Sequence, residues 1–118
     1  MIAAPIKTDK YDAAVAPLFG KAKWFAFIDK NDNITIEKNE LKNGLGVVEW
    51  LLEKGVNALL IQNMSQMPYE YIQKDGRISV FHVGSDRIEL SEALKKYSDE
   101  SLVIIDDSNA HEIIKMKL

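Results

Sequence analysis

The chain has 118 residues, of which 47% are hydrophobic and 28% charged, and its formal net charge is −3. This composition is typical of one globular domain, and nucleic acid is not expected as a partner because no basic stripe would neutralise its phosphates. The chain has no cysteine, which excludes disulfides, thiolate metal sites and cysteine nucleophiles. No apolar run reaches the roughly 20 residues that span a bilayer, and no signal-peptide pattern is present, so we expect a cytoplasmic protein without membrane contact.

The first third of the chain predicts three strands, the last two joined as a hairpin. Residues 1–7 form a short apolar run, in which Pro5 removes one ladder hydrogen bond. Residues 23–29 carry apolar side chains on both faces, which is typical of a strand covered on both sides. After the turn sequence KNDN, residues 34–39 alternate apolar and polar side chains.

The rest of the core alternates helices with strands. Apolar residues recur at helical spacing from Leu41 to Leu52, and Gly55 follows as a helix-ending glycine. We expect a second helix from Ser65, its N-cap, to the stop at Gly76, and a third at residues 86–97, where Asp86 and Glu89 resemble a capping box. The apolar runs at residues 56–62 and 77–83 predict two further strands.

Residues 99–118 hold two apolar clusters about a polar turn. The pattern fits either a hairpin or a strand followed by a short helix. Its apolar residues Ile113, Ile114 and Met116 are expected to cover a sheet edge or to pair with a second chain. We therefore expect a single domain over residues 1–118, with a core at 1–98 and a C-terminal extension at 99–118.

This element order predicts an α/β fold with a mixed five-stranded sheet, an antiparallel hairpin and helices on both faces. The first strand is expected at the centre, with right-handed crossovers. Ligands of open α/β sheets bind beyond the carboxyl ends of the parallel strands, at the switch point. Three loops are expected to meet there: residues 7–21, 38–44 and 62–66.

The candidate binding residues come from two of these loops. Lys7 and Lys21 would supply positive charge, and Gly20 would let the backbone turn sharply or approach a ligand. Phe19 would form a wall, although a Phe-Gly pair equally fits a plug and turn at the sheet edge. Asn63 and Ser65 precede a helix whose first N–H groups favour an anion.

The sequence from Ile2 to Tyr97 resembles the dinitrogenase iron–molybdenum cofactor biosynthesis family. The motif Phe-Gly-[Arg/Lys]-Ala-x-x-Phe is matched by residues 19–25, and Gly44 and Gly46 fit a glycine-containing loop before the first helix. The resemblance implies a ribonuclease H-like three-layer fold. It also implies a protein that binds or carries an iron–molybdenum or other metal–sulfur cluster, or an anionic precursor, and meets a protein partner in cofactor assembly.

The sequence departs from the family where many members carry histidine. Leu18 stands just before the Phe-Gly pair, and Leu41 with Lys42 occupies the second such region. Residues 63–66 replace a glycine-rich turn. These departures support a second interpretation, in which the chain has no cluster ligand and acts as a protein-interaction or regulatory module.

Other chemistry-bearing residues are few. His82 lies near the carboxyl end of its strand, as a structural histidine or as the one candidate metal ligand, while His111 is expected on the surface. Met64 and Met67 fit either core packing or soft thioether ligation. The first strand carries no carboxylate, which argues against a two-metal nuclease, and no catalytic motif is present, so we expect no enzyme.

Overall fold

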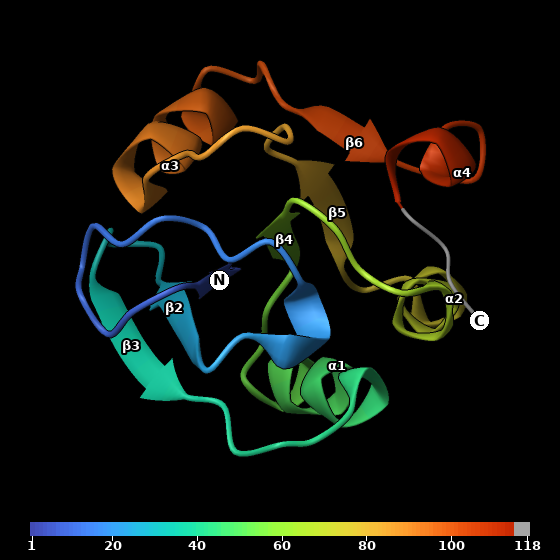
Figure 1. Cartoon of the computed structure of the whole chain (residues 1–118), viewed down its shortest axis with the longest axis horizontal. Helices are drawn as coiled ribbons and strands as arrows, with labels where there is room; N and C mark the ends of the chain where they lie inside the picture. Colours follow the sequence, from blue (N-terminus) through green and yellow to red (C-terminus); the bar gives the residue numbers. More distant parts are fainter. Residues whose placement is uncertain (115–118) are drawn as a thin grey trace.

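A computed structural model describes residues 1–114 and shows one mixed sheet with helices packed on both of its faces (Figure 1). The strands are β1 (Ile2–Ile6), β2 (Trp24–Ile28), β3 (Ile34–Lys38), β4 (Ala58–Ile61), β5 (Ser79–His82) and β6 (Val103–Ile105). The helices are α1 (Gly44–Glu53), α2 (Gln66–Asp75), α3 (Leu90–Ser98) and α4 (Ala110–Ile113), and a short 3₁₀ helix, η1, covers Phe19–Lys21.

The sheet has six strands in the order β3-β2-β1-β4-β5-β6. β1 is central as predicted, antiparallel to β2 on one side and parallel to β4 on the other. The prediction of five strands was wrong, because residues 103–105 add a sixth strand antiparallel to β5. Its three residues are too short to give an alternating pattern, and two of them are exposed.

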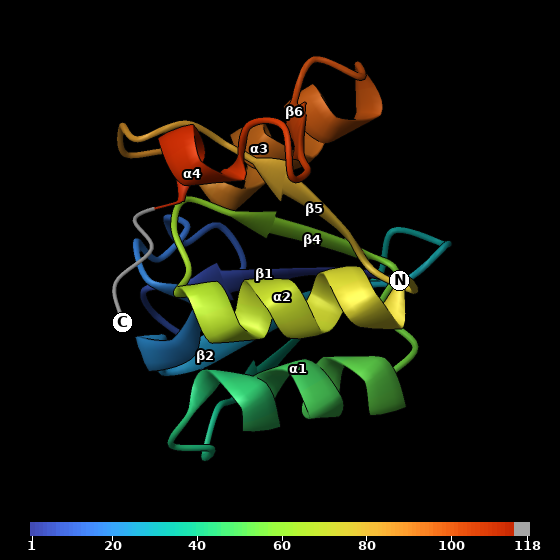
Figure 2. The same ribbon diagram turned by 90° about the vertical axis from the view of Figure 1, so that its right-hand side faces the viewer.

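The two faces of the sheet are covered unequally. α1, α2 and η1 lie on one face and α3 on the other, as the two views show (Figures 1 and 2). The larger core cluster lies on the α1 and α2 face and includes Phe19, Phe25 and Leu59. The smaller cluster lies on the α3 face and includes Ile6, Leu60 and other residues of the strands. Alternation along β1 and β4 explains this division, because neighbouring side chains point to opposite faces.

The helix ends differ in part from the prediction. α1 begins after Asn43, whose side-chain Oδ1 accepts a hydrogen bond from the Gly46 N–H at 2.7 Å, so Leu41 precedes the helix. α2 ends as predicted at Gly76, whose φ of 82° lies in the left-handed region that glycine favours. α3 begins only at Leu90, and the predicted capping box of Asp86 and Glu89 is wrong.

The cap of α3 comes instead from a distant loop. Asp12 accepts a hydrogen bond from the Ser91 N–H at 2.8 Å, and the pKa of its carboxyl is lowered by this bond. No local sequence pattern predicts a cap from a residue so far away along the chain. This contact holds the loop after β1 against the α3 face of the sheet.

The tail forms a strand and a short helix, one of the two predicted alternatives. Ile105 and Ile114 are buried in the larger core cluster, and Tyr69 of α2 donates a hydrogen bond from its hydroxyl to Asp107 Oδ1 at 2.9 Å. Burial and the neighbouring carboxylate raise the pKa of Tyr69 to about 12. The tail is thus fixed against α2. Ile114 lies in the larger core cluster and Ile113 packs against it, whereas Met116 lies outside the described residues.

None of the helices within residues 1–114 is both long enough and apolar enough to cross a membrane.

Candidate functional site

A hollow of about 200 Å³ lies where the three predicted loops meet. It is lined by Leu18, Phe19, Gly20, Lys21, Lys42, Asn43, Gly44, Met64 and Ser65. The loops place η1, the beginning of α1 and the beginning of α2 around one space. The position agrees with the carboxyl ends of β1 and β4, where the sheet topology predicts a ligand.

Phe19 forms the inner side of the hollow and is at the same time part of the core. It is fully buried and packs edge-on against Phe25, with ring centroids 5.7 Å apart. Its backbone N–H donates to the Asn63 carbonyl oxygen at 3.0 Å, which ties the η1 loop to the loop after β4. The sequence allows Phe19 either to plug the sheet edge or to form a wall of the pocket, and in the structure it does both.

Gly20 and Gly44 allow a close approach between η1 and α1. A Cβ built on Gly20 would lie 3.5 Å from the Gly44 Cα, an ordinary contact distance. A Cβ on Gly44 would lie only 2.4 Å from Cγ of Pro68, in the first turn of α2. Gly44 is therefore required by the packing of α1 against α2, and it keeps the backbone of both helices next to the hollow.

The charges that line the hollow are positive. Lys21 and Lys42 both contribute to its lining, and none of the lining residues that the structure describes is acidic. Within residues 1–114 neither lysine takes part in an ion pair. Both are exposed, so their ammonium groups remain available to an anion at the mouth of the hollow.

Two helix N-termini add partial positive charge at the same place. The first N–H groups of an α-helix have no partner inside the helix and bind anions readily. At α1, Asn43 already satisfies the Gly46 N–H. At α2, Ser65 occupies the N-cap position but its side chain makes no capping hydrogen bond, so its hydroxyl is not committed to the helix.

The remaining predicted residues lie outside the hollow. Lys7 is exposed, and its backbone N–H bonds to the Ala14 carbonyl oxygen at 2.9 Å, so residues 7–14 fold back toward the α3 face. Asn63 does not line the hollow, but its Oδ1 accepts from the Met64 N–H at 2.9 Å and its carbonyl holds Phe19. Met67 is 64% exposed and also lies outside it.

His82 is not among the lining residues of the hollow either. Its Nε2 atom is buried without a hydrogen-bond partner among the described residues, and burial lowers the pKa of the ring. Within residues 1–114, no three His, Asp or Glu side chains gather as a metal-ligand group. His82 as a metal ligand stays a prediction, and His111 is exposed as expected.

Sequence reasoning missed Lys42 and Asn43 as site residues. Both lie in the loop of residues 38–44 that was expected at this edge, and an Asn-Gly pair directly before a helical pattern is a recognisable helix start. For Met64 the sequence allows core packing or thioether ligation. It is 2% exposed and closes the inner side of the hollow.

Comparison with known proteins agrees with this fold. The family model described as dinitrogenase iron–molybdenum cofactor matches residues 1–100. No curated protein matches the chain.

Several solved structures share the fold. A candidate NifB protein from Thermotoga, solved by NMR, has 23% identity and a TM-score of 0.74, covering 87% of this chain and 90% of its own. The apo form of the orange protein from Desulfovibrio gigas has 19% identity and a TM-score of 0.76, covering 88% and 91%. A candidate dinitrogenase from Methanocaldococcus jannaschii has 18% identity and a TM-score of 0.69, covering 89% and 93%.

At these identities the solved structures show the fold alone, whereas the family model spans most of the chain. The chain belongs to the dinitrogenase iron–molybdenum cofactor family.

Proposed function

We propose that this protein is a non-enzymatic carrier that holds an anionic metal–sulfur cluster, or its precursor, in the hollow formed by η1, α1 and α2. The observation that carries the proposal is the meeting of Lys21, Lys42 and two helix N-termini around one space without an acidic residue. The same proposal includes a ribonuclease H-like fold and a cytoplasmic location for the protein. Family membership supports it.

The donor set favours a cargo held by charge and hydrogen bonds. The chain has no cysteine, and His82 is not in the hollow. The polar groups available are the two ammonium groups, the Ser65 hydroxyl and backbone N–H groups, all of which can donate to the sulfur or oxygen atoms of an anion. Among the lining residues within 1–114, the Met64 thioether is the one soft atom.

The volume of the hollow also favours a small anion as cargo. At about 200 Å³ it is smaller than the roughly 300–1,000 Å³ of sites that enclose drug-sized organic ligands. A small inorganic anion such as a thiomolybdate fits this scale. The exposed lysines would contribute mainly by attraction, which salt weakens.

A test of the proposal is retention of tetrathiomolybdate under anaerobic conditions, followed by visible absorption and metal analysis after desalting. The wild type is expected to retain the anion, and Lys21→Gln with Lys42→Gln to bind it roughly 3- to 30-fold more weakly, since each exposed charge contributes about 0.3–1 kcal/mol. The matched control is Lys10→Gln with Lys30→Gln, which removes equal charge from exposed residues outside the hollow. Equal loss in both double variants contradicts the proposed site.

A second candidate function is a protein-interaction module, and exposed apolar residues near the hollow favour it. Leu18 is 43% exposed, Leu41 42% and Met67 64%. Leu18 lines the hollow, Leu41 precedes the lining residue Lys42, and Met67 follows Ser65 by two positions. No retention of anion by the wild type, with capture of a partner that Leu18→Asp and Leu41→Asp abolish, would favour this module over the carrier.

A further inference from the structure

A second and larger hollow lies on the other face of the sheet. It has a volume of about 570 Å³ and is lined partly by strand residues and partly by α3. Ile2, Ile28 and Ile34 form its floor, because they pair directly across β1, β2 and β3. Ile28 belongs to the core cluster of the α3 face and Ile2 and Ile34 pack against it, whereas Phe19 and Met64 of the first hollow belong to the other cluster. We call this second hollow the isoleucine groove.

The groove follows from the unequal covering of the sheet. Within residues 1–114, α3 is the one helix on this face, and its Leu94 forms a wall of the groove. The β2–β3 end of the face is left to the loop after β1, from which Tyr11 reaches the rim with 68% of its surface exposed. The floor is therefore an apolar row that crosses three strands, with Ile2 and Ile34 half-buried at its ends and Ile28 buried between them.

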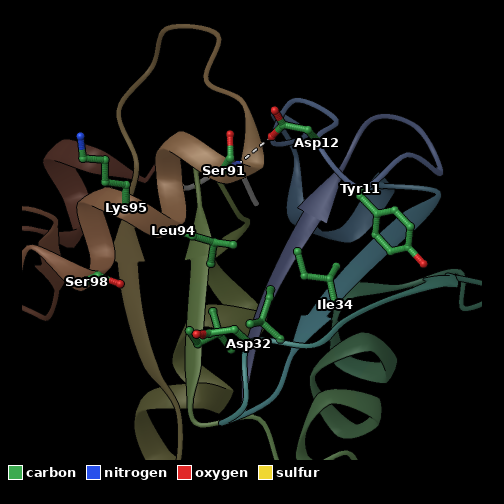
Figure 3. A pocket seen from close by; sticks show the side chains of 10 residues that line it. Tyr11, Asp12, Asp32, Ile34, Ser91, Leu94, Lys95 and Ser98 are labelled. Atoms are coloured by element: carbon green, nitrogen blue, oxygen red, sulfur yellow. Dashed lines mark hydrogen bonds between the residues drawn. The ribbon is translucent and has the colours of Figure 1, made fainter.

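Carboxylates stand at two separate places on the rim. Asp12 is held in position by its hydrogen bond from the Ser91 N–H, and Asp32 lies in the turn between β2 and β3 with a φ of 64°. In the close-up view, Asp12 and Asp32 lie on opposite sides of Leu94 and Ile34 (Figure 3). Within the described residues the Asp32 carboxylate has no hydrogen-bond or ion-pair partner.

Lys95 is the one cation that lines the groove within residues 1–114, and it does not neutralise this pair. Its ammonium nitrogen points away from Leu94 and Asp32 in the close-up view (Figure 3). Ser91 and Ser98 add hydroxyl groups from α3. The groove thus combines an apolar middle with negative charge at two separated points, on a chain whose net charge is −3.

We propose that the isoleucine groove binds a linear aliphatic diamine, with its ammonium groups at Asp12 and Asp32 and its methylene chain against Leu94 and the isoleucine floor between them. Charge complementarity selects this occupant. A dicarboxylate of the same length would meet like charge at both ends, and a monoamine would leave one carboxylate without an ammonium group opposite it. The apolar chain between the charges gains from burial on the isoleucines. The site is independent of the carrier proposal, because it lies on the opposite face.

The test is a calorimetric titration of the full chain with diamines from tetramethylenediamine to octamethylenediamine. Hexylamine and adipate serve as the controls for one ammonium group and for reversed charge. We expect saturable binding at one site, tighter for the best diamine than for hexylamine, and none for adipate. In methyl NMR spectra, Ile2, Ile28, Ile34 and Leu94 should shift, while Leu59 in the other core cluster should not.

Two conservative variants locate the charges. Asp12→Asn keeps an oxygen that can accept from the Ser91 N–H, and Asp32→Asn places a residue that tolerates the left-handed region. Each is expected to weaken the best diamine by roughly two- to fivefold, as removal of one exposed charge pair does. Asp86→Asn, an exposed carboxylate outside the groove, is the control for net charge.

Hexylamine binding as tightly as the best diamine, equal weakening by Asp86→Asn, or methyl shifts outside the groove would each overturn the proposal. Failure of this test leaves the anion retention of the first hollow untouched, since the two sites share no lining residue.

Discussion

His82 lies in β5 and does not line the hollow formed by η1, α1 and α2. It pairs with Ile61 of β4 and Val103 of β6, and its Nε2 atom is buried without a partner among residues 1–114. A buried imidazole favours its neutral form, and burial accordingly lowers the pKa of His82. The ring therefore packs as a neutral group between two strands.

The lowered pKa predicts that stability falls with acidification. In the unfolded chain His82 binds a proton as the pH drops through its ordinary value of 6.5, whereas in the folded chain it resists protonation. The free energy of unfolding should therefore decrease as the pH falls from about 8 to about 5. This interval lies above the pH range in which most carboxylates titrate. Chemical denaturation at these two pH values measures the change.

Substitution of each histidine in turn isolates this effect. His82→Gln should reduce the loss of stability over this pH interval, while His111→Gln, at an exposed position, should leave it as in the wild type. The same pH dependence in the wild type and in His82→Gln would contradict the account.

At the scale of elements, the approach of α1 to α2 depends on one glycine. A Cβ at Gly44 would meet the Pro68 ring at 2.4 Å, and that ring cannot turn aside. Gly44→Ala should lower the free energy of unfolding by about 1–3 kcal/mol, the usual cost of overpacking, despite the better helix propensity of alanine.

Gly20→Ala is the matched control, because its Cβ would find ordinary contacts and its backbone is not in the left-handed region. Its stability should be unchanged or raised by up to about 1 kcal/mol. Denaturant unfolding compares the two variants. A Gly44→Ala variant as stable as Gly20→Ala would show that α1 and α2 can move apart freely.

β6 and α4 attach the tail through a few buried side chains. Ile105 is 1% exposed, while its neighbour Ile104, on the opposite face of the same strand, is 53% exposed. Ile105→Ala should therefore cost about 2–4 kcal/mol of unfolding free energy, and Ile104→Ala less than about 0.5 kcal/mol. Thermal and denaturant unfolding of both variants would measure this, and equal costs would mean that β6 does not face the core as described.

Across the whole molecule, the sequence predicted the elements that have strong periodicity. β1, β2, β4 and β5 are apolar runs, and α1 and α2 end at glycines, so the central position of β1 and the meeting of three loops could be predicted. The tail pattern allowed a strand there, but not that β6 joins the sheet, since its three residues have no usable period and its place depends on pairing with β5.

The sequence predicted which loops form the candidate site better than it predicted which of their residues line it. Phe19, Gly20, Lys21 and Ser65 line the hollow together. Lys7 does not, because the pairing of Ile6 with Val15 turns its loop toward α3, a long-range contact that local sequence does not encode. Lys42 lines the hollow because it still belongs to the loop: the N-cap of α1 is Asn43, two residues after Leu41, where the apolar pattern begins.

The most direct measurement of the central claim is amide NMR of the wild-type chain during anaerobic titration with tetrathiomolybdate. The account predicts a saturable change confined to the backbone around the first hollow, largest at Gly20, Lys21, Gly44 and Ser65, and weakened by added salt. Shifts centred on His82, changes scattered over exposed lysines such as Lys10, or no change at saturating anion would contradict an anion site formed by η1, α1 and α2.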